Sequence, residues 1–228
     1  MIPSRSDHHS NLRAETEMAE PKEHWETVYR TKAPTEVSWY QAHLEKSLEL
    51  MLHSGVHKEG NIIDVGAGAS TLVDDLLAKG FEHVTVLDIS SDAIRSAKSR
   101  LGGCANKITW LEGDINKVTL PHHFYDVWYD RALFHFLTSK QDRQRYVEQA
   151  RRSLKGNGHL IMATFALTGP PRCSGLDVVR YSPESILAEL GRDFILLDAL
   201  NETHATPFDT KQEFIYCHFR KNPNAENN

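Results

Sequence analysis

A glycine-rich turn and an acidic side chain that follows it provide the clearest chemistry in this sequence. Residues 62–70 read Ile-Ile-Asp-Val-Gly-Ala-Gly-Ala-Ser, so an apolar stretch leads directly into Gly66 and Gly68. Two glycines let the backbone turn sharply and keep side chains out of the way of a ligand. Asp88 ends the next apolar stretch, about twenty residues after the turn, where a ribose-binding carboxylate is expected. The pattern indicates a site for a nucleoside.

Two classes of nucleoside ligand are compatible with this turn. The dinucleotide fingerprint needs a third glycine, which lets helix and strand pack closely around a pyrophosphate. Thr71 occupies that position here. A ligand with a ribose and no pyrophosphate, such as S-adenosylmethionine (SAM), does not need that glycine. The sequence therefore favours SAM and keeps an NAD-type oxidoreductase as an alternative.

Alternating strands and helices surround the turn and position it. Apolar stretches predict the strands, and stretches with helical periodicity predict the helices between them. The last two strands are close enough in sequence to form an antiparallel hairpin. A helical pattern between residues 20 and 52 precedes the first strand and is expected to cap a pocket. The predicted strands are residues 62–65, 84–88, 108–111, 125–129, 159–165, 194–200 and 213–220, and the predicted helices are residues 71–79, 92–101, 141–154 and 183–190.

This alternation predicts an α/β fold: a doubly wound, mostly parallel seven-stranded sheet with a C-terminal antiparallel hairpin and an N-terminal helical cap. In such sheets ligands bind outside the carboxyl ends of the strands, near the switch in strand order. That rule gathers the glycine turn with Asp88, Asp114 and Asp130 at one rim, because each acid ends or follows a predicted strand.

The composition is that of one globular domain. The chain has 228 residues and a net charge of −5, which suits a single hydrophobic core. We predict one domain over residues 21–221, with flexible polar tails at residues 1–20 and 222–228. No basic block and no membrane-length apolar run stands out, so neither nucleic acid nor a membrane is an expected partner. Three widely separated cysteines favour neither a disulfide framework nor a zinc site, and they predict a cytoplasmic protein.

Four segments around the rim resemble the motifs of class I, seven-stranded SAM-dependent methyltransferases. They are Asp64-Val65-Gly66-Ala67-Gly68, Leu87-Asp88-Ile89-Ser90, Glu112-Gly113-Asp114-Ile115 and residues 125–131. The resemblance covers roughly residues 23–220. It implies a methyltransferase that uses SAM, releases S-adenosyl-L-homocysteine (SAH), and acts on an unidentified small molecule or protein side chain.

The resemblance also implies roles for individual rim residues. Gly66 and Gly68, with Ala67 between them, would pass under the methionine and ribose part of SAM. Asp88 would accept hydrogen bonds from both ribose hydroxyls, because a carboxylate has two acceptor oxygens. Asp64 is expected mainly to hold the glycine loop through its amides. The other implied cofactor residues are Ile89, Gly113, Asp114 and Ile115 for the nucleoside, and Asp130 and Arg131 near the methionine and the methyl group.

Aromatic residues before the first strand resemble a further part of this family. Trp25 and Tyr29, followed by Trp39 and Tyr40, match pieces that close over SAM in a branch containing some protein-lysine methyltransferases. A sulfonium beside aromatic faces gains cation–π attraction. Ordinary packing of an amphipathic helix on the sheet is the alternative. Residues 130–136 differ from those lysine methyltransferases, so the resemblance does not extend to a lysine substrate.

Methyl transfer from SAM is an in-line displacement whose leaving group is a neutral thioether, so the enzyme mainly needs to align its reactants. No metal-ligand spacing is evident and no metal is expected. His135, just after the fourth strand, and His204, in the hairpin connection, are candidate bases for a hydroxyl or ammonium acceptor. Core packing is the alternative for His135. Residues 170–181 are expected to form the acceptor wall, and a non-catalytic SAM-binding or partner-binding domain is the third hypothesis.

Overall fold

The computed structural model describes residues 21–223. Of the tails predicted at residues 1–20 and 222–228, residues 1–20 and 224–228 lie outside the described residues. Within the described residues the chain alternates between strands and helices, as the sequence predicts. The main strands are β1 (Asn61–Val65), β2 (His83–Asp88), β3 (Ile108–Glu112), β4 (Tyr125–Arg131), β5 (Leu154–Phe165), β8 (Phe194–Ala205) and β9 (Lys211–Lys221). The helices are α1 (Pro21–Thr31), α2 (Glu45–His53), α3 (Leu72–Ala78), α4 (Ser91–Leu101), α5 (Lys140–Ser153) and α6 (Pro183–Leu190), with short 3-10 helices η1 (Pro34–Glu36), η2 (Gly102–Lys107), η3 (Phe134–Phe136) and η4 (Gly191–Asp193).

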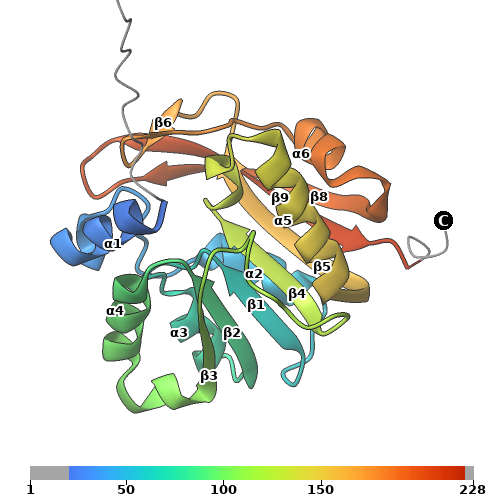
Figure 1. Ribbon diagram of the computed structural model, residues 1–228, viewed down its shortest axis with the longest axis horizontal. Coiled ribbons are helices and arrows are strands. Elements are labelled where there is room, and N and C mark those ends of the chain that lie inside the picture. The colour runs from blue at the N-terminus through green and yellow to red at the C-terminus, as the bar shows by residue number, and fades with distance from the viewer. Residues whose placement is uncertain (1–20, 224–228) are drawn as a thin grey trace, which may run out of the picture.

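One seven-stranded sheet forms the centre of the molecule, in the order β3-β2-β1-β4-β5-β9-β8 (Figure 1). Strands β1 to β5 pair in parallel, whereas β9 pairs antiparallel with both β5 and β8. The strand order reverses between β1 and β4, which creates the crevice where sheets of this type bind ligands. The predicted fold, with its C-terminal hairpin, is confirmed.

Helices cover both faces of the sheet. On one face Tyr146 and Ala150 of α5, with residues of α6, pack on β4, β5 and β9. On the other face Leu50 and Met51 of α2, with residues of α3, pack on alternate residues of the same strands. Successive side chains of a strand point to opposite faces, so a shift of one residue decides which helix layer a side chain meets. This alternation determines which of the predicted site residues face the ligand-binding crevice and which face the core.

The N-terminal cap is helix α1, which lies beside α4 at the carboxyl ends of the strands (Figure 1). Its residue Val28 is buried. Helix α2, which belongs to the same predicted helical stretch, packs instead on the sheet, where Ser47 Oγ lies 2.5 Å from the hydroxyl of Tyr129. One part of the helical stretch therefore covers the rim, and the other part completes the core.

Strands β5 and β8 depart most from the bounds that the sequence predicts. Strand β5 begins at Leu154, not at His159, because Leu154 pairs with Tyr125 of β4 and the Lys155 ammonium lies 2.7 Å from the Asp126 carboxylate. Strand β8 continues to Ala205, because pairing with β9 extends well past Leu200. The predicted loop after β5 also contains a small hairpin, β6 (Arg172–Cys173) and β7 (Leu176–Asp177).

Candidate functional site

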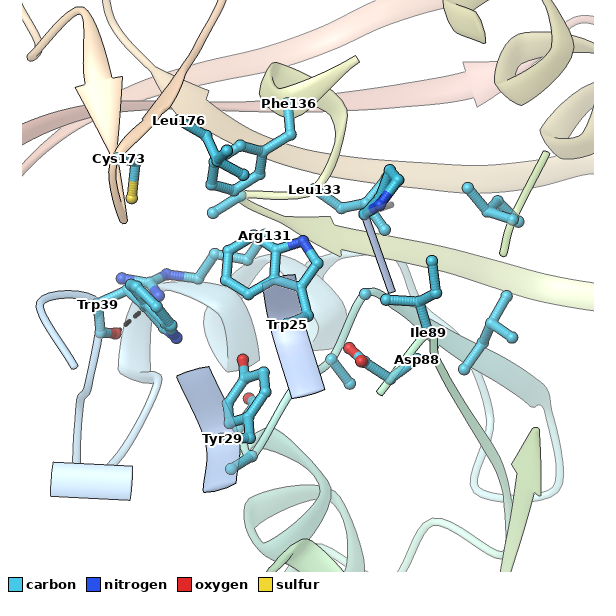
Figure 2. A pocket seen from close by; sticks show the side chains of 18 of the residues that line it. Trp25, Tyr29, Trp39, Asp88, Ile89, Arg131, Leu133, Phe136, Cys173 and Leu176 are labelled. Atoms are coloured by element: carbon cyan, nitrogen blue, oxygen red, sulfur yellow. Dashed lines mark hydrogen bonds between the residues drawn. The ribbon is translucent and has the colours of Figure 1, made fainter. Parts of the chain in front are cut away.

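A cavity of about 570 Å³ lies at the carboxyl ends of β1, β2 and β4, where the strand order reverses. Helix α1 and the segment before α2 form one wall, and the β6–β7 hairpin forms another (Figure 2). This volume is within the range of small-molecule and cofactor sites. Among the predicted cofactor residues, Trp25, Tyr29, Trp39, Tyr40, Asp64, Gly66, Ala67, Asp88, Ile89, Gly113, Asp114, Ile115 and Arg131 line the cavity.

The glycine turn makes room for protein side chains. Gly66 and Gly68 have φ angles of 66° and 58°, in the left-handed region that favours glycine. A Cβ atom on Gly66 would lie 2.3 Å from Leu133 Cδ1, and one on Gly68 would lie 2.1 Å from the Tyr29 hydroxyl oxygen. Leu133 and Tyr29 therefore occupy part of the space that was predicted for a ligand. Tyr29 covers Gly68.

Asp88 holds the glycine loop and faces the cavity (Figure 2). Its Oδ2 accepts a hydrogen bond from the Gly68 amide at 2.7 Å, and its Oδ1 accepts one from the Ser90 amide at 2.8 Å. Burial raises the pKa of Asp88 to about 6, against these two hydrogen bonds, which lower it. Each carboxylate oxygen keeps acceptor capacity for a ligand hydroxyl.

Asp64 does not hold the loop as the sequence predicted. The amides of Gly66 and Ala67 donate to the Leu87 carbonyl, and the Gly68 amide donates to Asp88. Because β1 pairs with β2, the Leu87 carbonyl reaches the loop first, and Asp64 is left at the cavity wall.

Asp64 and Arg131 line the cavity, and each also has a buried polar atom without a partner. Within residues 21–223, neither Asp64 Oδ2 nor Arg131 Nη2 has a hydrogen-bond partner. The guanidinium is fixed by Nε, which donates to the Tyr216 hydroxyl at 3.0 Å, and by Nη1, which donates to the Trp39 carbonyl at 3.0 Å. Unpaired buried polar atoms are costly. A ligand that carries both an ammonium and a carboxylate would offer hydrogen-bond partners to these two side chains.

Asp130 lies outside the cavity, contrary to the sequence prediction. It is next to Arg131 on β4, so its side chain points to the opposite face, toward α5. There its carboxylate accepts hydrogen bonds from the Leu133 and Phe134 amides and, at 2.6 Å, from the Tyr146 hydroxyl. Asp130 therefore organises the turn after β4 and takes no part in the cavity wall.

His135 is a core residue and not a base at the cavity. It is fully buried in η3, with its ring 4.5 Å from the Phe136 ring and 4.7 Å from the Phe165 ring. Its Nδ1 accepts a hydrogen bond from the Phe165 amide at 3.3 Å. Burial, helped by the Arg131 charge, lowers the pKa of His135 to about 3. The turn directs the next residue, Phe136, into the cavity instead.

His204 also has a structural position. It lies inside β8 and not in the hairpin connection, and it is absent from the cavity wall. Its Nε2 lies 2.8 Å from the Ser38 carbonyl oxygen, to which it donates, and its Nδ1 lies 3.0 Å from Gln41 Nε2, from which it accepts. His204 thus fastens the segment that carries Trp39 and Tyr40 to the C-terminal hairpin.

The end of the cavity that is formed by Ile89, Gly113 and Asp114 suits a flat heterocycle. Ile89, Ile115 and Leu133 provide apolar surfaces, and Gly113 and Asp114 lie beside them. Asp114 Oδ1 accepts a hydrogen bond from the Asn116 amide at 2.9 Å, which fixes the carboxylate. A fixed carboxylate can accept a hydrogen bond from an exocyclic amino group.

Aromatic rings form the wall between the two ends. The Trp25 ring contacts those of Phe136 and Trp39 edge to face, with centroids 5.0 Å and 5.9 Å apart, and lies 6.2 Å from that of Tyr29. Figure 2 shows Trp25 between Asp88 and Ile89 on one side and Phe136 and Leu176 on the other. The predicted cap residues therefore meet at the cavity.

Sequence reasoning missed two wall residues, Leu133 and Phe136. Leu133 and Phe136 lie close to the candidate base His135 in the sequence. No periodicity indicates which of these three residues lines the cavity. Cys173 and Leu176, from the predicted acceptor loop, both line the cavity. Cys173 is buried, and burial raises its pKa to about 11, so its thiol is part of an apolar wall.

The comparisons with known proteins agree with this geometry. Residues 63–162 match the family model of the methyltransferase domain. This chain carries a class I SAM-dependent methyltransferase domain. Human EEF1A lysine methyltransferase 2 is 23% identical to it over 194 residues, covering 78% of this chain and 76% of that protein.

Other similar proteins are larger or share the fold alone. Mouse eEF1A lysine and N-terminal methyltransferase is 26% identical over 110 residues, which cover 48% of this chain. This chain aligns with only 16% of the length of that protein. The N-methyltransferase NodS from Bradyrhizobium japonicum, solved with SAH, has a TM-score of 0.61 at 17% identity, covering 78% of this chain and 84% of that one.

The methyltransferase domain fits SAM better than a dinucleotide. At the position of the third fingerprint glycine, the Thr71 hydroxyl donates to the Gln41 carbonyl at 2.9 Å, so a side chain stands where the dinucleotide fingerprint needs a glycine for close helix–strand packing. Asp64 and Arg131 also line the same cavity, where they offer polar partners of the kind that an amino-acid group needs. An NAD-type oxidoreductase is not favoured.

Residues 21–223 contain neither a metal-binding cluster of His, Cys, Asp or Glu side chains nor a membrane-spanning helix. Within that range no cluster of three or more His, Cys, Asp or Glu side chains has the geometry of a metal site. In the same part of the chain no helix combines the length and the apolar character needed to cross a bilayer.

Proposed function

We propose that the protein transfers the methyl group of SAM to the side-chain nitrogen of a lysine in another protein and releases SAH. The relatives named as eEF1A lysine methyltransferases support a protein lysine as acceptor. One of them aligns over most of its length, and the larger one over about a sixth of its length, so the acceptor of this chain needs its own test.

The cofactor would lie along the rim. Asp88 would accept hydrogen bonds from the ribose hydroxyls, and Asp114 would accept one from the adenine amino group, between Ile89 and Ile115. Asp64 would bind the ammonium of the methionine part. Arg131 Nη2 would bind its carboxylate, because a guanidinium pairs well with that group.

The acceptor would enter at the other end of the cavity. When bound there, SAM supplies a methyl group on a sulfonium, whose sulfur leaves as a neutral thioether. The wall of Trp25, Trp39, Phe136, Cys173 and Leu176 is apolar. Such a wall packs against the aliphatic stem of a lysine. An apolar environment also lowers the pKa of an amine, so the residues can favour the neutral nucleophile without a histidine base.

The observation that carries this proposal is the continuity of one cavity from the acids of β1 and β2 to this aromatic wall. The test combines purified protein, SAM with a labelled methyl group, and either eEF1A or a size-fractionated cell extract. Expected is label on a protein fraction, located on lysine by mass spectrometry, with an equal amount of SAH. The Asp88→Asn variant serves as the inactive control.

The outcomes separate the hypotheses. Label in the small-molecule fraction alone would overturn the lysine acceptor and leave the methyltransferase in place. SAM binding without any SAH formation would favour a non-catalytic SAM-binding domain. We also propose a cytoplasmic location and no nucleic-acid acceptor, as the cysteine content and the net charge of −5 suggest.

A further inference from the structure

Helix α1 is attached to the nucleoside end of the cavity by one carboxylate. Glu26 Oε1 accepts a hydrogen bond from the Ser91 amide at 2.8 Å, and its Oε2 accepts from the Asp92 amide at 3.0 Å and from the Ser90 hydroxyl at 2.9 Å. These donors form the first turn of α4, whose amides have no partner within the helix. A carboxylate from another helix therefore completes the α4 N-terminus.

The electrostatics of this contact are favourable. The N-terminus of a helix carries a partial positive charge that stabilises an anion. Burial opposes ionisation of Glu26, but the hydrogen bonds from Asp92, Ser91 and Ser90 outweigh it and lower the pKa of Glu26 to about 2. The carboxylate is ionised at neutral pH, and the contact has its full strength there.

The same contact joins the cap to the ribose site. Glu26 stands between Trp25 and Tyr29 on α1, and both of these side chains line the cavity. Ser90 donates its hydroxyl to Glu26 and its amide to Asp88 Oδ1. One residue thus positions the predicted ribose acid and holds the cap.

Helix α1 also forms an ion pair, which is a weaker attachment. The Lys22 ammonium lies 2.5 Å from the Glu112 carboxylate, but the two side chains are 52% and 45% exposed. Exposed pairs of this kind contribute little to stability. The Glu26 contact, with three hydrogen bonds to the start of α4, is therefore the stronger of these two attachments.

We propose that Glu26 is a positioning residue that latches helix α1 over the cofactor and sets the rate at which SAM enters and SAH leaves. The idea rests on the SAM site proposed above. Trp25 and Tyr29 cover the cavity while α1 is docked, so ligand exchange requires α1 to lift, and lifting breaks the three hydrogen bonds to α4.

The test measures SAH dissociation by stopped-flow tryptophan fluorescence, since Trp25 and Trp39 line the site. Glu26→Gln loses the charge at the helix terminus, and we expect dissociation to become about tenfold faster. Glu26→Asp keeps the charge on a shorter side chain and should be intermediate. Glu23→Gln is the matched control, because Glu23 is an exposed acid one turn earlier on α1, and its rate should equal that of the wild type.

Equal SAH dissociation from Glu26→Gln and wild type would overturn the latch. Hydrogen exchange of the α1 amides, measured without ligand, provides a readout independent of the cofactor. Faster exchange in Glu26→Gln than in Glu23→Gln supports the attachment, and equal exchange overturns it. Failure of the wild type to bind SAM or SAH would overturn the proposed function together with the cofactor role of Glu26, even where the exchange data show that α1 is attached.

Discussion

The β1–β2 half of the rim and the β4–β5 half use similar polar residues for different purposes. At the ends of β1 and β2, Asp64 and Asp88 face the cavity and keep acceptor capacity. At the end of β4 and in the turn after it, Asp130 and His135 are fully buried and accept hydrogen bonds from backbone amides. The first half is built to bind a ligand, and the second half is built to hold a turn that presents Arg131 and Phe136.

A position at the rim of the sheet therefore does not by itself place a side chain in the cavity. In register, Asp64 pairs with Tyr129, and Asp130 pairs with Val65. Asp64 and Arg131 therefore share one face of the sheet, whereas Asp130 shares the other face with the α5 core. Variants in the two halves should accordingly affect different measurements, and this contrast can be tested directly.

The largest effect is expected for Asp88→Asn. It removes the charge that two ribose hydroxyls would bind, and hydrogen bonds to a charged group contribute about 1.5–3 kcal/mol each. SAM affinity should fall by about 100-fold or more, as measured by calorimetry. Circular dichroism should show an intact fold. Normal affinity in this variant would remove Asp88 from the ribose site.

Asp130→Ala should damage stability instead. The Leu133 and Phe134 amides and the Tyr146 hydroxyl lose their acceptor, and unpaired buried donors cost about 1–3 kcal/mol each. We expect the free energy of unfolding to fall by about 3 kcal/mol in urea titrations. SAM affinity of the folded protein should change little. A selective loss of affinity with full stability would contradict the contrast between the halves.

His135→Ala should cost about 2 kcal/mol of stability, because it opens a cavity and leaves the Phe165 amide without its acceptor. SAM affinity should match that of the wild type. The pH dependence of methyl transfer should also be unchanged, since the pKa of His135 is about 3 and its ring is neutral at neutral pH. A lost inflection near neutral pH would restore a role for this residue as a base.

The smallest effect is expected for Asp64→Asn, at about tenfold in SAM affinity. Burial, with the charges of Asp130 and Asp88, raises the pKa of Asp64 to about 8. At pH 7 the free protein is therefore mostly protonated at Asp64, and binding of an ammonium favours the ionised form. SAM binding should release about one proton in wild type, measured by calorimetry in buffers of different ionisation enthalpy, and this release should disappear in the variant. Equal release by both proteins would place the ammonium elsewhere.

The fold could be predicted because apolar strands and amphipathic helices alternate along the chain. The place of Asp88 at the cavity could be predicted because the motif fixes Asp88 relative to Gly68. The rest depends on contacts between distant segments. His204 was assigned to a loop because the outer part of β8 is polar, and its strand structure comes from pairing with β9. Glu26 binds the start of α4, which lies more than sixty residues further along the sequence. No local sequence pattern predicts such a contact.

The attachment of Ser38 and Gln41 to the C-terminal hairpin has a consequence for the newly made protein. His204 and Gln212 bind this segment, yet they are synthesised long after it, by about ten seconds or more at ordinary translation rates. A nascent chain that still lacks β8 and β9 cannot fix the wall that carries Trp39. Competence for the cofactor should therefore arise only after the ribosome has released these last two strands.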